Sequence, residues 1–151
     1  MRSKSNQYKY SDEQGSYTVC FGDRTLEIKF IGILSNQLIE KFCEDLGLML
    51  GVVEWRYWGY YADLTECDEE SATSRKTLVD LRKRFLDKGC IVDAYTITNP
   101  DAVEHLIKSS KDAGVENYLL DENIFPDRKQ AIDFIHSVLL KVEKSSAKVL
   151  L

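Results

Sequence analysis

Polar or acidic side chains follow three runs of strand-forming residues in this sequence. The three stretches are Asp63 to Ser71, Thr98 to Asp101 and Asp121 to Asp127. In open α/β sheets, ligands bind beyond the carboxyl ends of the parallel strands, where loops and helix N-termini meet. These stretches are therefore the places where binding or catalysis is expected.

The carboxylates in these stretches offer one route to enzymatic chemistry. Asp63, Asp68 and Asp121 could converge on a Mg²⁺ ion, or two of them could act as general acid and base. The alternative is that Asp68, Glu69 and Glu70 stabilise the positive end of a helix dipole, at about 0.3–1 kcal/mol each. We favour the second interpretation, and we expect neither a bound metal nor a cofactor.

The other residue types on which enzymes commonly rely are poorly placed. His105 and His136 both fall in segments with helical periodicity, so neither lies in the three stretches as a base for a serine or cysteine nucleophile. The glycines are isolated, which argues against a phosphate-binding loop. The cysteines lack Cys-x-x-Cys spacing and are expected to be reduced and inert, except that Cys67 falls in a polar stretch that reads as a loop. The sequence therefore predicts a protein that is not an enzyme.

The length, charge and apolar content of the chain bound the class of protein and the kinds of partner that it can bind. A chain of 151 residues has the usual size of one domain with a single core. Its net charge is −5, with acids and bases interspersed, which argues against nucleic acid because nucleic acid binds concentrated basic surfaces. The N-terminus lacks the apolar run of a signal peptide, and no stretch approaches the ~20 apolar residues of a membrane-spanning helix. We therefore expect a cytoplasmic protein with no membrane insertion.

Patterns of apolar residues predict the elements that would bring the three stretches together. Period-2 alternation and β-forming residues predict five strands, the first two joined by a turn at Gly22-Asp23: 17–21, 25–33, 55–64, 90–97 and 116–122. Helical spacing predicts four helices, which begin after Ser35, at Asp68, after Asn99-Pro100 and after Pro126. This order, β-β-α-β-α-β-α-β-α, predicts an α/β fold with a mostly parallel mixed sheet and amphipathic helices.

The boundaries of the domain follow from the same patterns. Residues 1–16 are polar and without periodicity, so we expect a flexible N-terminal tail. Residues 17–143 carry all the predicted elements and form one domain, and residues 144–151 are expected to fray. Within the domain, Ser35 is predicted to cap the first helix and Gly51 to end it.

The aromatic run at residues 55–61 has two interpretations. On a strand its side chains alternate, so that Trp58 and Tyr60 face one side while Gly59 and Tyr61 face the other. Large rings on both faces indicate that both faces are covered, and packing in the core is the simpler explanation. Rings with polar tips beside a glycine are also typical of an interface or an apolar ligand pocket.

The order of elements and several motifs resemble the STAS domain, the fold of bacterial anti-sigma-factor antagonists, and more closely the stand-alone STAS-like proteins related to lipid-binding Sec14 domains. Three stretches, together with a closing helix that has alanine at 131, carry the resemblance over residues 17 to 140: "TLEIKFIGILS", "YYADLTECDEESATS" and "KGCIVDAYTITNPDAVEHLIKSSKDAG". The resemblance implies a regulatory module that is not an enzyme and that binds another protein.

In antagonists of this kind, a serine at the start of the second helix is phosphorylated, and this switches partner binding. A phosphate adds about −1.5 to −2 charges at a helix N-terminus. Where the antagonists have Asp-Ser-Ser-Gly, this chain has Asp-Glu-Glu-Ser-Ala-Thr-Ser at 68–74, so the switch candidates are Ser71, Thr73 and Thr65. The competing interpretation is that Asp68 or Ser71 only caps the helix.

The predicted partner or ligand surface lies around this helix start and consists of Asp63, Asp68, Glu69, Trp58, Tyr60, Asn99 and Asp121. We expect a protein partner, which could be a second copy of the chain in a homodimer. The aromatic strand and the Sec14-like kinship motivate an alternative, in which the domain binds a small apolar ligand or a lipid.

Overall fold

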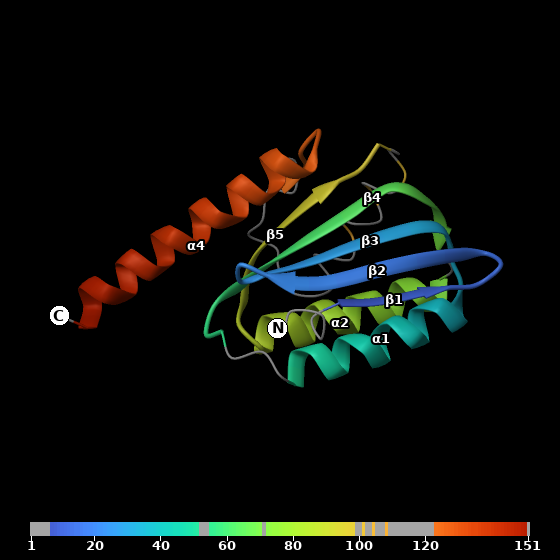
Figure 1. Ribbon diagram of the computed structural model, residues 1–151, viewed down its shortest axis with the longest axis horizontal. Helices are drawn as coiled ribbons and strands as arrows, with labels where there is room; N and C mark the ends of the chain where they lie inside the picture. The colour runs from blue at the N-terminus through green and yellow to red at the C-terminus, as the bar shows by residue number, and fades with distance from the viewer. Residues whose placement is uncertain are drawn as a thin grey trace.

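The chain folds into one mixed sheet with helices on both faces (Figure 1). The computed structural model describes residues 7–51, 55–70, 72–98 and 123–150, with Asp101, Glu104 and Lys108. Side chains are described for these residues except those at 68–70, 72–76, 78–79 and 146–150. The α/β class and the mixed sheet that the sequence predicts are confirmed.

Within the part of the chain that the structure describes, five strands form the sheet in the order β1-β2-β3-β4-β5. β2 is antiparallel to both of its neighbours, β1 and β3, whereas β3, β4 and β5 are parallel to one another. Their bounds are Gln7–Ser11, Gly15–Gly22, Thr25–Leu34, Trp58–Glu70 and Cys90–Thr96. The predicted hairpin of β2 and β3 is present, but its turn lies one residue later than the predicted Gly22-Asp23, because Gly22 still pairs with Thr25. The turn residues Asp23 and Arg24 have φ of 50° and 57°, a conformation that two-residue hairpin turns favour.

Helices cover both faces of the sheet. α1 (Asn36–Gly51) and α2 (Ala72–Asp87) lie on one face, and α4 (Arg128–Leu150) contacts β4 and β5 on the other (Figure 1). The Ser35 hydroxyl accepts a hydrogen bond from the Leu38 amide (3.2 Å), which confirms Ser35 as the N-cap of α1. The Asp127 carboxylate accepts from the Gln130 amide (2.9 Å) in the same way at the start of α4.

The larger part of the core lies between the sheet and the α1–α2 layer. Alternate residues of β2, β3 and β4 face these helices, because successive side chains on a strand point to opposite faces. Fully buried members of this cluster include Val19, Ile28, Leu38, Phe42 and Trp58. Removing one such side chain from water contributes about 1.5–3 kcal/mol, so this layer is a main source of the stability of the fold.

A smaller cluster joins α4 to β4 and β5. Ala131, Ile135 and Leu139 recur at four-residue spacing on α4 and are completely buried against the sheet. Gly59 lies directly beneath this contact, since a Cβ atom there would lie 2.4 Å from Ile135 Cγ2 and 3.0 Å from Val92 Cγ1. The glycine in the aromatic run therefore permits the close approach of α4 to the sheet.

The N-terminal segment differs from the predicted flexible tail at residues 1–16. Residues 7–11 form β1 and pair along their whole length with β2. The physical reason is that Tyr8 and Tyr10 alternate on the strand and pack against the larger core cluster. The Asp12 carboxylate then closes the turn into β2 by accepting hydrogen bonds from two following amides (2.8 and 3.0 Å).

The boundary between β4 and α2 also differs from the prediction. The sequence predicts that β4 ends at Leu64 and that a helix begins at Asp68, but β4 continues to Glu70 and α2 begins at Ala72. The extension is a strand because it pairs with β3 as far as Leu34↔Glu70. The interpretation of Asp68, Glu69 and Glu70 as acids in the first turn of that helix is therefore wrong.

The C-terminal part of the chain differs in one further respect. α4 continues to Leu150, through the segment from residue 144 that is predicted to fray, and this segment contains good helix formers such as Lys144 and Ala147. The predicted strand 116–122 lies outside the described residues. So does most of the helix predicted after Pro100, of which Asp101, Glu104 and Lys108 are described as helical.

Candidate functional site

The candidate site lies where β4 runs past the end of β5. The last pair between these strands is Asp63↔Thr96, whereas β4 stays paired with β3 as far as Leu34↔Glu70. Among the described strands, residues 64–70 of β4 are therefore flanked by β3 alone, and they lead directly towards α2. This is the carboxyl edge of the parallel strands, where the sequence predicts a functional surface.

Two β-bulges interrupt this part of β4. Relative to β3, the first inserts one extra residue of β4 between Asp63 and Glu66, and the second does so between Cys67 and Glu69. A bulge leaves a residue outside the ladder, bends the strand and re-aims its side chains, and bulges are common beside functional sites. The end of β4 therefore presents an irregular surface and not a regular strand.

Asp63 supports the first bulge. Its Oδ1 accepts hydrogen bonds from the backbone amide of Thr65 (3.0 Å) and from the Thr65 hydroxyl (2.7 Å). A short acidic side chain can replace the ladder partner of an amide two residues further on. Two of the residues that the sequence nominates are thus in direct contact, and their contact holds the backbone of the site.

Lys29 of β3 brings a positive charge to the same surface. Its Nζ lies 2.8 Å from a carboxylate oxygen of Glu66 and 3.8 Å from Oδ2 of Asp63. The hydrogen bond with Glu66 raises the pKa of Lys29, and the charge of Asp63 acts in the same direction. Exposed ion pairs of this kind typically contribute less than about 1 kcal/mol, so they can exchange for contacts with a partner at little cost.

The remaining predicted site residues fall into three groups. Asp68 and Glu69 lie in the bulged part of β4, and Thr73 lies in the first turn of α2. Trp58 and Tyr60 lie in the core. The residues outside the described part of the chain are Ser71, Asn99 and Asp121. A phosphorylation switch at Ser71 therefore stays a prediction.

Trp58 and Tyr60 do not belong to the candidate surface. Trp58 is fully buried, its indole N–H donates to the Lys88 carbonyl (2.8 Å), and its ring lies edge-on to Phe85 (5.4 Å between centroids). The Tyr60 ring lies 5.2 Å from that of Phe85 and 5.8 Å from that of Tyr95. Their assignment to a partner surface is wrong, because the α1–α2 layer covers this face of β4.

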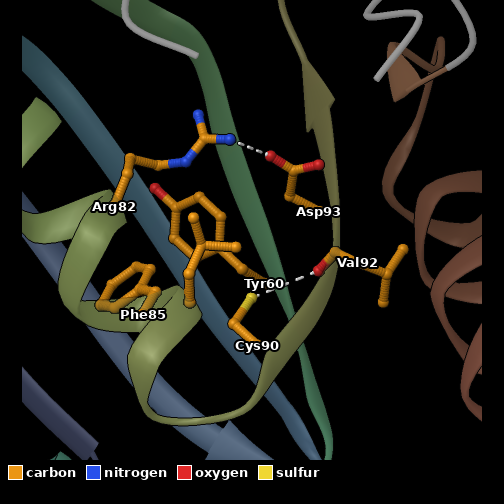
Figure 2. Close-up of a pocket in the computed structure, with 7 residues that line it drawn as sticks. Tyr60, Arg82, Phe85, Cys90, Val92 and Asp93 are labelled. Atoms are coloured by element: carbon orange, nitrogen blue, oxygen red, sulfur yellow. Dashed lines mark hydrogen bonds and ion pairs between the residues drawn. The ribbon is translucent and has the colours of Figure 1, made fainter. Parts of the chain in front are cut away.

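A small cavity lies beside Tyr60, at the seam between α2 and β5 (Figure 2). Its volume is about 10 Å³, close to the space that one water molecule needs, whereas ligand pockets usually measure roughly 300–1,000 Å³. Trp58 and Tyr60, two of the aromatic rings that motivate the lipid-binding alternative, both pack against Phe85. They therefore no longer favour that alternative.

Asp93 is a buried acid that the sequence motifs do not single out. Its Oδ2 accepts hydrogen bonds from the Arg82 guanidinium (2.5 Å) and from the Tyr95 hydroxyl (2.7 Å), and its Oδ1 accepts one from the side-chain amide of Asn123 (3.0 Å). Figure 2 shows Arg82 reaching from α2 to Asp93 on β5. The sequence contains one indication of this role, because Asp93 lies inside the apolar strand "CIVDAYTI" and a carboxylate in a buried strand needs hydrogen-bond partners.

The cysteines are free thiols, and Cys67 lies in β4 and not in a loop. Cys67 is half-buried against the larger core cluster. Burial raises the pKa of Cys90 to about 12, and it also raises the pKa values of Cys20 and Cys43. Because the thiolate is the nucleophile, these three thiols are poorly suited to covalent chemistry near neutral pH.

Other features bear on catalysis, metal binding and membranes. His136 lies in α4 with an enclosed Nε2 that has no hydrogen-bond partner among the described residues, and His105 lies outside them. Within the described ranges, no three His, Cys, Asp or Glu side chains are grouped so that they could hold a metal ion. None of the helices that the structure describes is long and apolar enough to span a membrane.

Comparisons with solved structures identify the fold. The chain is similar to an uncharacterised protein of the DUF3478 family from Shewanella loihica PV-4, which has a SpoIIAA-like fold. The TM-score is 0.59 at 17% identity, and the alignment covers 83% of this chain and 98% of that one. No family model and no curated protein matches the sequence.

Two proteins of transporter families are also similar. One is the murine anion transporter Solute Carrier 26 family member A9 in its inward-facing state, with TM-score 0.56, 13% identity and coverage of 76% of this chain but 18% of the transporter. The other is a sulfate transporter family protein from Wolinella succinogenes, with TM-score 0.57, 12% identity and coverage of 78% and 89%. The chain therefore has a SpoIIAA-like (STAS-like) fold, as its sequence resemblance predicts.

Proposed function

We propose that this STAS-like domain is a regulatory module without catalytic activity, and that it binds another protein through the surface from Asp63 to the first turn of α2. The observation that carries the proposal is the irregular end of β4. The strand extends beyond β5, contains two bulges and continues to Glu70, two residues before α2 begins at Ala72. Irregular segments held by a rigid scaffold are common places for binding sites.

The contacts of Asp63 favour a binding role over a catalytic one. Its Oδ1 is engaged by two hydrogen bonds from Thr65, and its Oδ2 faces Lys29 at 3.8 Å. A general base must lie within hydrogen-bonding reach of the proton that it removes, with a lone pair available for it. Oδ1 of Asp63 is instead committed to the bulge, and Oδ2 takes part in an ion pair with Lys29.

The charge of this surface indicates the kind of partner. Residues 63–70 include five acids, Asp63, Glu66, Asp68, Glu69 and Glu70, and Lys29 pairs with two of them. Complementary charge steers association and selects partners. We therefore propose a protein partner with a basic surface, whose binding weakens with added salt because screening acts over about 8–10 Å at physiological ionic strength.

Site-directed photo-crosslinking tests this function. A photoreactive amino acid replaces Glu66, whose side chain is 55% exposed, in the cells that make the protein. The matched control carries the same probe at Asp133 on α4, whose side chain is 64% exposed. We expect the probe at position 66 to capture a protein that the probe at position 133 does not capture.

Two results would contradict the proposal. One is the absence of a cross-linked protein from position 66, and the other is the same product from both positions. A cross-linked product made of two copies of the chain would identify this surface as a homodimer interface and not as the binding site of a regulatory partner.

A further inference from the structure

α2 is held on the sheet by few apolar contacts in its described part. Of its described side chains, at Thr77 and from Asp80 to Asp87, two apolar ones are buried, Leu81 and Phe85. On α1, by contrast, six apolar side chains are buried: Leu38, Ile39, Phe42, Leu46, Met49 and Leu50. Because apolar burial is the main attraction between a helix and a sheet, α1 is fixed more firmly than the described part of α2.

A buried ion pair supplies a further tie between α2 and the sheet. Arg82 Nη2 lies 2.5 Å from Asp93 Oδ2, and the two side chains are 11% and 9% exposed. The same carboxylate accepts hydrogen bonds from Tyr95 and Asn123, and the Arg82 guanidinium lies 5.8 Å from the centroid of the Tyr95 ring. Asp93 therefore joins α2, β5 and the segment that precedes α4.

The packing beside the ion pair is incomplete. The cavity of about 10 Å³ lies between Arg82, Phe85 and Leu86 on α2 and Cys90 and Asp93 on β5 (Figure 2). Atoms that line a void lose dispersion contacts on that side, and Leu86 remains 41% exposed. Along this seam the ion pair therefore compensates for apolar contacts that are missing.

The C-terminal end of α2 is anchored to β4 by Trp58. Its indole N–H donates to the Lys88 carbonyl (2.8 Å), and its backbone amide donates to the Gly89 carbonyl (3.1 Å). Gly89 has a φ of +102°, and a Cβ atom there would lie 2.4 Å from the Arg56 carbonyl oxygen, so this turn requires glycine. One end of α2 is thus fixed, and the other end belongs to the proposed docking surface.

We propose that the Arg82–Asp93 pair is a latch that sets the position of α2, and that α2 pivots at Gly89 when this pair opens. Arg82 lies seven residues from Gly89 and ten residues from Ala72, so a displacement at Arg82 becomes a larger one at the docking surface. The consequence for binding rests on the proposed function: a partner that displaces the start of α2 must break the pair. The latch is then the two-state element on which the partner acts.

Hydrogen exchange of the full chain, followed by mass spectrometry, tests the latch. Two substitutions break the pair independently, Asp93→Asn and Arg82→Gln. We expect the α2 amides to exchange at least about tenfold faster in both variants while the α1 and α4 amides keep their rates, because local opening proceeds without global unfolding.

Two further variants are matched controls. Tyr95→Phe removes one hydrogen bond to Asp93 but keeps the ion pair, and Asp45→Asn alters another buried carboxylate, which accepts a hydrogen bond from Tyr17 (2.5 Å) on the α1 side. Neither should accelerate exchange in α2 selectively.

The latch is overturned if the α2 amides of both ion-pair variants exchange at the wild-type rate, or if exchange accelerates equally in α1, α2 and α4. It is also overturned if Tyr95→Phe accelerates exchange selectively in α2. None of these outcomes requires a partner. The proposed function is tested separately by cross-linking at position 66, so failure of the one is distinguishable from failure of the other.

Discussion

Asp63 holds the first bulge of β4 in place through Thr65, because one carboxylate oxygen accepts from the Thr65 amide at 3.0 Å and from its hydroxyl at 2.7 Å. The extra residue of the bulge would otherwise leave this amide without a partner in the ladder. A local side-chain contact and the pairing with β3 together keep the acidic segment in a strand as far as Glu70. The position of the proposed docking surface depends on this contact.

Replacing Asp63 by alanine should destabilise the protein, because the Thr65 amide loses its partner. We expect the free energy of unfolding, measured by urea denaturation, to fall by about 1–3 kcal/mol. Thr65→Val keeps the amide contact and loses only the hydroxyl contact, so it should cost about 1 kcal/mol. Glu66→Ala is the exposed control and should change stability by less than about 0.5 kcal/mol. Equal losses in all three variants would show that the contact does not support the bulge.

Gly59→Ala should push α4 away from the sheet, because the new Cβ would lie 2.4 Å from Ile135 Cγ2. We expect a loss of about 1–3 kcal/mol from overpacking. Ile135→Ala removes the obstructing methyl group, so the double variant should lose less stability than the sum of the two single variants. Gly47→Ala, at an exposed α1 site with no atom within 4 Å of the new Cβ, should instead stabilise by up to about 1 kcal/mol. Strict additivity of Gly59→Ala and Ile135→Ala would refute the clash.

Elements with local signals are predictable from the sequence, and the start of α1 shows why. The Ser35 cap and the apolar stripe from Leu38 to Leu50 lie within the segment that they define. The end of β4 is different, because "TECDEE" has low strand propensity and becomes a strand only through pairing with β3. β1 likewise depends on remote contacts, since Tyr8 and Tyr10 pack on a core that other segments supply.

The same distinction applies to the candidate site. Asp63 and Thr65 are two residues apart, so their contact is accessible to sequence reasoning. The partners of Asp93 come from positions as distant as Arg82 and Asn123, with separations of 11 and 30 residues, and no spacing rule brings them together. Trp58 and Tyr60 were ambiguous for a related reason: an aromatic strand looks the same whether a helix layer or a ligand covers it.

The protein should lose stability in alkaline solution, and Cys90 should account for part of the loss. Burial raises the pKa of its thiol from the ordinary value of 9.0 to about 12. Between these values the unfolded chain has released a proton that the native chain still holds, so stability falls as pH rises, by up to about 1.4 kcal/mol per pH unit. Burial also raises the pKa values of Tyr17 and Tyr95 above 10.0, which acts in the same direction at higher pH.

Urea denaturation at several values between about pH 8 and pH 11 measures this slope. Cys90→Ala should give a shallower dependence on pH than the wild type, whatever its stability at neutral pH. Val92→Ala is the control, because it truncates a buried neighbour on β5 without removing a titratable group, and its pH dependence should run parallel to that of the wild type. An unchanged slope in Cys90→Ala would mean that the thiol does not contribute.

His136→Leu should raise stability, because Nε2 of His136 is enclosed and has no hydrogen-bond partner in the part of the chain that the structure describes. An enclosed polar atom with no partner costs its desolvation energy, and an apolar side chain at the same place does not. We expect a gain of about 1 kcal/mol in the free energy of unfolding, measured by urea denaturation at neutral pH. Lys141→Leu, at an exposed position on the same helix, controls for the general effect of leucine in α4 and should change stability by less than about 0.5 kcal/mol. A loss of stability in His136→Leu alone would show that the imidazole makes a favourable contact in solution that the enclosed nitrogen does not reveal.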